Sequence, residues 1–319
     1  KKKTLKNLSK IKIKKINLKK RVYKTISEAY KNHVAKACFI FASSDSHAGL
    51  CIESLRLNLH TYCVKSIALN KIEFKKIMKE RNKRKKIVFF QGYNNQWNEA
   101  SLKMQEWINS KEGIGQMIGG KCICWGRQDL SKLKNNDHLK NPGMFFHTLA
   151  CHQLSQLVAA KGMPNYVTSI SHKHVSSELG YKKVFGTTGG QCIFEYPNNI
   201  PFSYIGSRAA HFNPYGFASR WSGQWIIHGK KGDLFRQGGR LTLFKKGFSV
   251  RDVYLKDLDE KLITDEIPQI KIFHQLIKKN KKMKKFEENS INTWILLEAC
   301  NESARIKKRI SLKEFKKKL

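Results

Sequence analysis

Residues 87–90, Ile-Val-Phe-Phe, form an unbroken apolar run, and the polar turn Gln-Gly-Tyr-Asn-Asn follows at residues 91–95. β-Branched and aromatic residues in such a run are typical of a strand buried on both faces, as in a parallel sheet. The apolar residues after the turn recur at the spacing of an amphipathic helix: Trp97, Ala100, Met104, Trp107 and Ile108. Strand, short loop and helix make up most of a βαβ unit, so this stretch predicts an α/β fold.

The same order returns less cleanly later in the chain. Residues 166–170 predict a strand, residues 174–179 a short helix and residues 183–185 a further strand. We therefore expect an α/β domain with a mainly parallel sheet.

Both ends of the chain also predict helices. Residues 25–28, Thr-Ile-Ser-Glu, fit a capping box that begins a helix reaching about Ala37. Residues 38–41 either extend that helix or start a strand. The last helix is expected from about Ser290 into the basic C-terminal end.

The charge balance is the strongest compositional signal. The 319 residues include 62 Lys and Arg against 24 Asp and Glu, a formal charge of +38, although the charged fraction is an ordinary 27%. Such a surplus favours a polyanionic partner: nucleic acid, which releases counterions when phosphates are neutralised, or an anionic membrane surface. Codon bias explains a preference for Lys over Arg, but it does not explain why acids are scarce.

Cysteine spacing and hydropathy argue against several other classes. The eight Cys lack the spacing of a disulfide framework, and Cys122 and Cys124 are too close together for a usual zinc knuckle. No apolar run approaches the roughly 20 residues needed to span a bilayer. We expect no metal and no cofactor.

Composition divides the chain into three parts. Residues 1–24 form a basic arm that cannot build a core alone, residues 25–204 carry the α/β pattern, and residues 205–319 form a basic C-terminal extension. Within the extension, residues 208–240 combine Gly, Arg and aromatics, which suits RNA contact and equally suits an ordinary β-rich segment. Residues 252–266 are an acidic stretch that fits either a basic neighbouring protein or a solvated helix face.

Motifs for catalysis are weak. The sequence contains no Walker-type loop, no nucleophile elbow and no zincin helix. Residues 113–120 are glycine-rich but lack the strand-then-helix order of a dinucleotide fingerprint. His172 and His174 are a possible catalytic pair, and a surface position at the end of a strand is the simpler interpretation.

Several segments in order resemble the small-subunit ribosomal protein two family. A strand at residues 86–90 and a helix precede residues 119–128, whose Gly-Gly-x4-Trp spacing is similar to that family's motif. Further similar segments are residues 46–49, 65–71, 162–165 and 194–199. The family's second entry histidine is Leu50 here, there is little room for its helical hairpin between Arg127 and Lys161, and its Asp-rich loop is replaced by residues 186–190.

The resemblance implies a flavodoxin-like (Rossmann-like) parallel sheet with helices on both faces. It implies a structural, non-enzymatic constituent of the small ribosomal subunit, in a divergent mitochondrial version, held by ribosomal RNA and neighbouring ribosomal proteins during translation, with no membrane partner and no small-molecule substrate. The ring of Trp125 is expected in the core. The side chains predicted to contact RNA are His47, Arg56, Lys121, Arg127, Arg208, Arg220, Arg236 and Arg240.

Two other classes remain open. One is an RNA-processing or RNA-modifying enzyme that uses His172 or His174. The other is a protein bound to an anionic membrane. Sedimentation with the small subunit, turnover on free RNA and flotation with liposomes distinguish the three.

Overall fold

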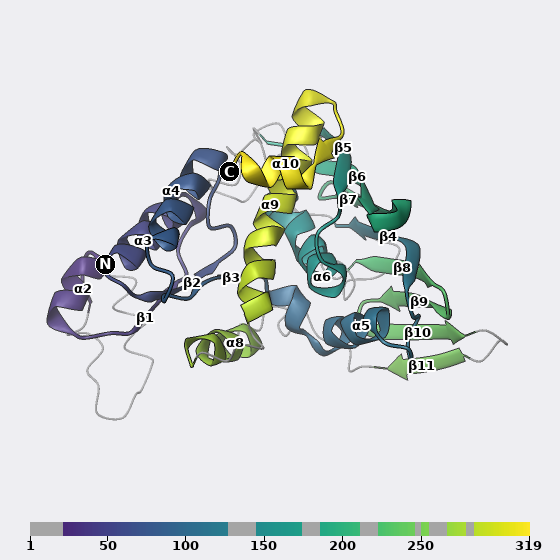
Figure 1. The fold of residues 1–319 in the computed structure, drawn as a ribbon, viewed down its shortest axis with the longest axis horizontal. Helices are drawn as coiled ribbons and strands as arrows, with labels where there is room; N and C mark the ends of the chain where they lie inside the picture. Colours follow the sequence, from purple (N-terminus) through teal and green to yellow (C-terminus); the bar gives the residue numbers. More distant parts are fainter. Residues whose placement is uncertain are drawn as a thin grey trace.

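The computed structural model describes residues 22–126, 145–173, 186–210, 223–245, 250–254, 267–278 and 284–319. The described strands form two sheets, one of three strands and one of nine. The long helix α9 (Lys284–Ile306) runs between them (Figure 1).

The smaller sheet is parallel, with the order β1 (Ala37–Ile40), β2 (His60–Val64), β3 (Phe89–Gly92). Helix α3 (Ser44–Arg56) connects β1 to β2, and α4 (Lys71–Asn82) connects β2 to β3. At the start of α4 the Asn70 side chain accepts a hydrogen bond from the Glu73 N–H at 2.9 Å, while the Glu73 carboxylate accepts one from the Leu69 N–H at 2.8 Å. These bonds satisfy donors that a helix N-terminus leaves unpaired.

Strand β3 is buried on both faces, which explains the unbroken apolar run at residues 87–90. Phe89 packs in one core cluster with Leu55 of α3 and Ile77 of α4. Phe90 packs in another with Tyr62 of β2 and Phe273 of α8 (Ile267–Ile277). The predicted Rossmann-like parallel sheet with helices is therefore confirmed.

The larger sheet is mixed. Its order is β11-β10-β9-β8-β4-β7-β6-β5-β12, and only β4 and β7 are parallel neighbours among its described strands. The bounds are β4 (Met117–Trp125), β5 (Tyr166–His172), β6 (Gly189–Tyr196), β7 (Ile200–Ser207), β8 (Gln224–Gly229), β9 (Gly232–Gln237), β10 (Arg240–Lys245), β11 (Val250–Tyr254) and β12 (Ile310–Ser311). The expectation of one mainly parallel sheet was wrong for residues 166–170, because β5 pairs antiparallel with β6.

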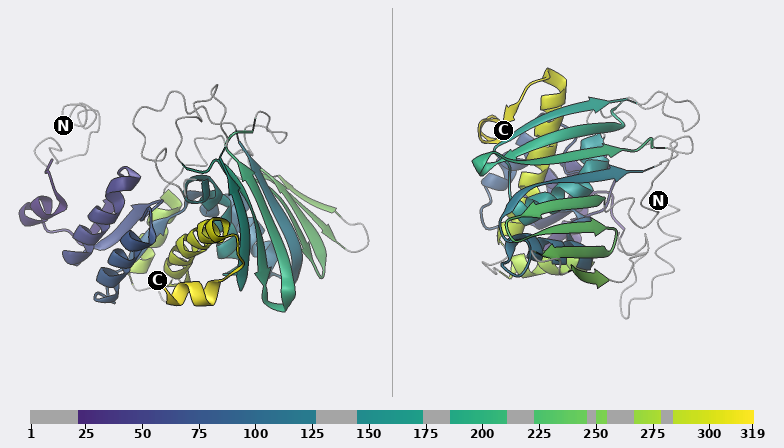
Figure 2. Two further views of the ribbon diagram at one scale, coloured as in Figure 1. Left: turned by 90° about the horizontal axis from the view of Figure 1, so that it is seen from above. Right: turned by 90° about the vertical axis from the view of Figure 1, so that its right-hand side faces the viewer.

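Helices cover one face of the larger sheet, and the other face points outward (Figure 2). The covering helices are α5 (Glu99–Asn109), which follows the 3-10 turn η2 (Asn94–Trp97), and α6 (Cys151–Lys161), which continues the π-helical turn η4 (Phe146–Ala150). The 3-10 turn η6 (Pro197–Asn199) joins β6 to β7, and α10 (Leu312–Lys317) ends the described chain beside α9. Trp125 lies on the sheet with 36% of its surface exposed, so its ring is not in the core as expected.

The predicted local elements are present with shifted ends. Helix α2 (Ile26–Asn32) begins at the Thr25 cap, whose hydroxyl accepts from the Glu28 N–H at 3.0 Å, but it ends five residues before Ala37. The apolar run at residues 38–41 contributes to strand β1. The boundary predicted between residues 204 and 205 lies inside β7, so both segments share one sheet.

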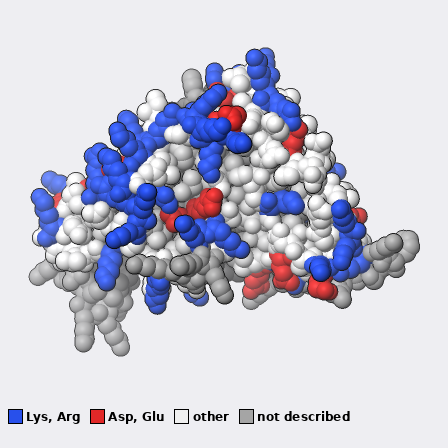
Figure 3. Space-filling model, viewed as in Figure 1, with Lys and Arg blue, Asp and Glu red and all other residues white. Residues whose placement is uncertain are grey.

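Basic side chains gather over α3 and α4 (Figure 3). None of the described helices combines the length and the apolar character needed to cross a bilayer. Most of the acidic stretch at residues 252–266, the helix predicted at residues 174–179 and the strand predicted at residues 183–185 lie outside the described residues.

Arg236 of β9 is fully buried and joins the larger sheet to its helices. It donates from Nε to the Gly238 carbonyl at 3.0 Å, and from Nη1 to Ser101 Oγ of α5 at 3.0 Å and Gln156 Oε1 of α6 at 2.7 Å. Burial lowers the pKa of this guanidinium to about 10, which still leaves it charged at neutral pH. Arg236 is therefore a structural cation and cannot contact RNA as predicted.

We expect Arg236→Met to lower the free energy of unfolding by about 3 kcal/mol, because buried acceptors would lose their donor and each such loss costs ~1–3 kcal/mol. The matched control is Arg240→Met on β10, whose exposed side chain should change stability by less than about 0.5 kcal/mol. Urea unfolding followed by circular dichroism measures both. Equal effects of the two substitutions would contradict this role for Arg236.

Candidate active site at the edge of the parallel sheet

Lys65 immediately follows β2, at the carboxyl end of the parallel strands. In open α/β sheets this edge is where ligands bind. The half-buried Lys65 side chain donates from Nζ to the carbonyl of Thr148, in the π-helical turn that precedes α6, at 3.0 Å. This bond connects the loop after β2 to the helices of the larger sheet.

His152 of α6 lies in the same region and is buried, with 9% of its surface exposed. Burial lowers the pKa of this imidazole well below its ordinary value, and the positive charges of Lys65 and Arg208 lower it further. His152 is therefore neutral at pH 7. Its backbone carbonyl accepts a hydrogen bond from Gln156 Nε2 at 2.7 Å, which holds this turn of α6 in place.

Arg208 brings a second cation to the cluster from the end of β7. The side chain is 5% exposed, and its Nη2 donates to the Thr148 hydroxyl. Its backbone N–H donates to the Thr188 carbonyl at 2.8 Å. Thr148 thus binds both cations, through its carbonyl to Lys65 and through its hydroxyl to Arg208.

Two further groups lie close to these three. Tyr93 follows β3 and is 1% exposed; burial raises the pKa of its hydroxyl well above the ordinary value, and nearby Cys151 adds to the shift. Burial also raises the pKa of the Cys151 thiol, while the positive charges of Lys65 and Arg208 act against that rise. Tyr93 and Cys151 are therefore neutral near pH 7.

Two histidines hold the loop that follows Lys65. His47 of α3 lies with Nδ1 2.7 Å from the Ser66 carbonyl and Nε2 2.9 Å from the Ala42 carbonyl. His147 lies with Nε2 3.1 Å from Glu298 of α9 and Nδ1 3.4 Å from the Ser66 hydroxyl. The two histidines therefore hold the loop after β2 in place at the carboxyl edge of the parallel sheet, and His147 links it to α9.

The arrangement places a charged amine, a charged guanidinium and a neutral imidazole together in a buried setting. Such a set can stabilise negative charge on an oxygen and accept a proton from it. Among the described residues, no three His, Cys, Asp or Glu side chains are grouped to hold a metal ion.

No family model and no curated protein sequence matches the chain. Solved structures do match. An oxidoreductase from Agrobacterium radiobacter in complex with NAD+, L-tartaric acid and magnesium gives a TM-score of 0.74 at 15% identity, over 92% of this chain and 84% of that one. An NAD binding oxidoreductase from Klebsiella pneumoniae gives a TM-score of 0.72 at 13% identity, over 87% of this chain and 80% of that one. Myo-inositol 2-dehydrogenase from Lactobacillus plantarum gives a TM-score of 0.66 at 16% identity, over 91% of this chain and 84% of that one.

These solved structures are oxidoreductases and a dehydrogenase, and two of them are described with NAD. The chain has the fold of these oxidoreductases. This likeness overturns the resemblance to ribosomal protein two and the assignments that depended on it: a structural ribosomal constituent, a non-enzyme, a partner of ribosomal RNA and ribosomal proteins, and a protein without a small-molecule substrate. The predicted mitochondrial location stays a prediction.

The segment that carried the resemblance has a different structural role. Residues 119–125 belong to strand β4, and a Cβ at Gly120 would lie 2.8 Å from the Ile226 carbonyl oxygen of β8. Glycine is therefore required there by close packing of strands. Gly120 thus has a simple structural cause, whereas a Cβ at Gly119 would lie in ordinary contact, 3.6 Å from the Pro201 carbonyl oxygen.

The residues predicted to contact RNA do not form one surface. Arg56, Lys121 and Arg240 are exposed, and Arg56 pairs with Glu80 at 3.4 Å. His47, Arg208 and Arg236 are buried, so their side chains cannot bind a polyanion's phosphates. Arg127 and Arg220 lie outside the described residues. His172 is exposed at the end of β5 and His174 is not described, so the RNA-enzyme alternative is also unsupported.

The sequence interpretation missed Lys65, Thr148 and His152. A usable signal was present for Lys65, which directly follows the strand-like residues 60–64, because strand ends are where ligands bind in α/β folds. His152 is one of six polar residues in the stretch 145–158, so the local sequence did not single it out.

The neutral state of His152 predicts a pH dependence of stability. The folded pKa is lower than the unfolded value of 6.5, so below about pH 6.5 the unfolded chain binds a proton that the folded chain does not. The free energy of unfolding should then fall by up to ~1.4 kcal/mol per pH unit as the pH decreases. His152→Asn should remove the contribution of this imidazole to the decrease in the free energy of unfolding between pH 7.5 and pH 5.5. Urea unfolding at pH 7.5, 6.5 and 5.5 measures it.

The exposed His274 of α8 offers the control. His274→Asn should keep the slope of the unmodified protein. A His152→Asn protein whose stability falls as steeply below pH 6.5 would show that this imidazole titrates normally in the fold.

Proposed function

We propose that this chain is an enzyme of the oxidoreductase type, and that Lys65, His152 and Arg208 form its active site. The proposal is carried by the convergence of these three side chains, from β2, α6 and β7, at the carboxyl edge of the parallel sheet. Perturbed titratable groups that meet at such an edge are a signature of functional sites.

The substrate class we propose is a small compound with hydroxyl or carbonyl groups. Two structural neighbours favour it: one is described in complex with L-tartaric acid and another is a myo-inositol dehydrogenase. Lys65 and Arg208 offer hydrogen-bond donors to substrate oxygens, and neutral His152 offers an acceptor to a hydroxyl proton.

Oxidation of a hydroxyl group to a carbonyl releases one proton and one hydride, and the hydride would pass to a separate hydride-accepting molecule such as a nicotinamide. The residues of this chain account for the proton: His152 is neutral and accepts it, while the positive charges of Lys65 and Arg208 stabilise the negative charge that develops on the oxygen. In the reverse direction the same groups protonate the oxygen of a carbonyl substrate.

The described residues do not fit the phosphates of a nicotinamide dinucleotide. A dinucleotide's pyrophosphate sits on a glycine-rich turn between a strand and a helix, and the described turn between β1 and α3 contains no glycine. The turn between β1 and α3 is Phe41-Ala42-Ser43, followed by Asp45 in the first helical turn, and the Ser43 hydroxyl donates to that carboxylate at 2.5 Å. A carboxylate there disfavours a phosphate.

The proposal therefore assigns to these residues substrate binding and proton transfer, and it assigns no step to the dinucleotide. We expect NADH to bind this chain weakly, with a dissociation constant above about 1 mM. Titration followed by NADH fluorescence measures it. Micromolar binding would show that another part of the chain replaces the glycine-rich turn.

We expect L-tartrate or myo-inositol to bind the purified chain and Lys65→Met to weaken that binding by about tenfold, since losing ~1.4 kcal/mol of interaction free energy changes affinity by that factor. The matched control is Lys75→Met, an exposed lysine on α4, which should bind as the unmodified chain does. Isothermal titration calorimetry measures the affinities. Equal affinity in all three proteins, or binding by none of them, would contradict the proposed site.

A further inference from the structure

The outward face of the larger sheet is apolar. Five of the eleven large apolar side chains that are exposed in the described part of the chain lie on its strands, with 36% to 72% of their surface exposed. Each of the five follows a buried residue, and the side chains of a strand alternate between its two faces. They therefore point away from the covering helices, onto the face that the right-hand view of Figure 2 shows. The five are Ile118 and Trp125 of β4, Ile170 of β5, Ile193 of β6 and Phe244 of β10.

Half-buried side chains extend this apolar surface across neighbouring strands. Ile123 of β4 lies two residues before Trp125 and is paired with Ile205 of β7. Ile226 of β8 is paired with Phe235 of β9. Each residue of these two pairs lies between two buried residues, so alternation places it on the outward face. The apolar surface therefore runs through the middle of the sheet and is not confined to one edge.

Strands β4 to β10 add no net charge to this face, although the chain carries +38. Their charged residues at outward positions are Lys121, Glu195, Asp233 and Arg240, two of each sign. Nucleic acid and anionic membranes are attracted by clustered cations, and basic side chains gather elsewhere, over α3 and α4 (Figure 3). The outward face therefore suits an apolar partner surface without a strong charge of its own.

The partner that best fits this face is a second copy of the chain. Two molecules with a large positive charge repel each other, and contact through a neutral face keeps their lysines apart. A twofold axis brings the same patch of both copies together, so an apolar face is covered by an equally apolar one. Two sheets pack face to face in this way in β-sandwiches, with interdigitating side chains.

The size of the face also matches the needs of a dimer. Nine strands at a spacing of ~4.8 Å span about 40 Å, and six residues of a strand span about 20 Å. The face therefore covers roughly 800 Å², which is the area that each partner buries in an interface of standard size.

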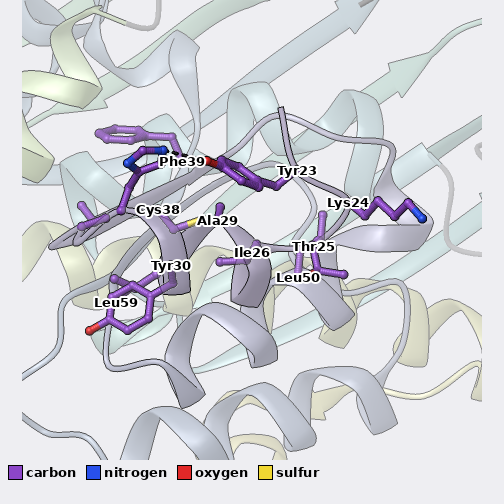
Figure 4. A pocket seen from close by; sticks show the side chains of 13 residues that line it. Tyr23, Lys24, Thr25, Ile26, Ala29, Tyr30, Cys38, Phe39, Leu50 and Leu59 are labelled. Atoms are coloured by element: carbon purple, nitrogen blue, oxygen red, sulfur yellow. Dashed lines mark hydrogen bonds between the residues drawn. The ribbon is translucent and has the colours of Figure 1, made fainter. Parts of the chain in front are cut away.

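The groove between α2, β1 and α3 does not offer such a surface. It has a volume of about 530 Å³, and its apolar lining includes Ile26 and Ala29 of α2, Cys38 of β1 and Leu50 of α3 (Figure 4). A hollow cannot be filled by the same hollow of a second copy, because a twofold axis brings identical surfaces together. The sheet face is therefore the better candidate for contact between two copies.

We propose that this chain forms a homodimer in which the outward faces of the two larger sheets pack on each other. Ile123 and Ile205 lie near the middle of the covered area, and Ile193 and Phe244 extend it on either side. The proposal does not depend on the proposed enzyme site, because the side chains of that site are buried or half-buried away from this face.

The mass of the full chain in solution tests the proposal. Size exclusion with light scattering should give twice the 36.9 kDa of one chain at micromolar concentration. Ile170→Lys/Ile193→Lys should raise the dissociation constant of the dimer about a hundredfold, because lysines would then be buried against an apolar surface. The matched control is Phe41→Lys/Ile72→Lys, two exposed apolar residues outside the larger sheet, which should leave the dissociation constant unchanged. A monomeric unmodified chain, or equal effects of the two double variants, would overturn the proposal.

A second measurement uses a smaller change that preserves the fold. Ile193→Cys is made in a Cys38→Ser background, because the other seven native cysteines are buried. Its thiol should react about tenfold faster with a thiol reagent after dilution below the dissociation constant, the factor expected when roughly nine chains in ten are dimeric before dilution. Ile72→Cys in the same background should react at one rate throughout. An Ile193→Cys thiol whose rate is also independent of dilution would overturn the proposal.

Discussion

Helix α9 fixes the relation between the two sheets by supplying hydrogen-bond acceptors to strand β3 of the smaller sheet and strand β5 of the larger one. At the smaller sheet, the Glu287 carboxylate accepts from the Phe89 N–H at 3.1 Å and the Ser290 hydroxyl from the Gln91 N–H at 3.3 Å. At the larger sheet, the Ser303 hydroxyl accepts from the Ser169 N–H of β5 at 2.9 Å. Buried edges need such partners. Between these contacts Trp294 stacks on Phe74 of α4, with ring centroids 3.9 Å apart, and donates to the Ala68 carbonyl at 3.1 Å.

The candidate site depends on this helix because its residues come from both sides of α9. Lys65 belongs to the smaller sheet, while His152 and Arg208 belong to the layer of the larger one, and Thr148 binds both cations. Glu298 of α9 contacts His147, which neighbours Thr148 in the chain. A rotation of one sheet against the other would therefore separate the amine from the imidazole. The helix that joins the two sheets also sets the geometry of the site.

Local patterns in the sequence were sufficient for local structure and insufficient for topology. The capping box at Thr25, the apolar run at residues 87–90 and the helical spacing of Trp97 to Ile108 each depend on neighbours along the chain. The predicted elements are present with shifted bounds, since α2 ends at Asn32, β3 is Phe89–Gly92 and α5 begins at Glu99. The direction in which β5 pairs depends on partners distant in sequence, so no local signal distinguished parallel from antiparallel. The site was missed for the same reason, since Lys65 and His152 lie far apart in the chain and meet only when the sheets pack.

The +38 charge of the chain predicts an RNA partner only if net charge is evidence of function. Charge describes solubility and non-specific attraction, not fold. The lysines of α4 and the cations Arg208 and Arg236 contribute equally to that sum, but only the first group faces solvent (Figure 3). A buried cation costs desolvation and persists only with hydrogen-bond partners. Arg236 has hydrogen-bond partners in α5 and α6, and Arg208 has Thr148. The burial of a cation, and not the total charge of the chain, therefore distinguishes the arginines that stabilise the fold and the site from the lysines that cover the surface.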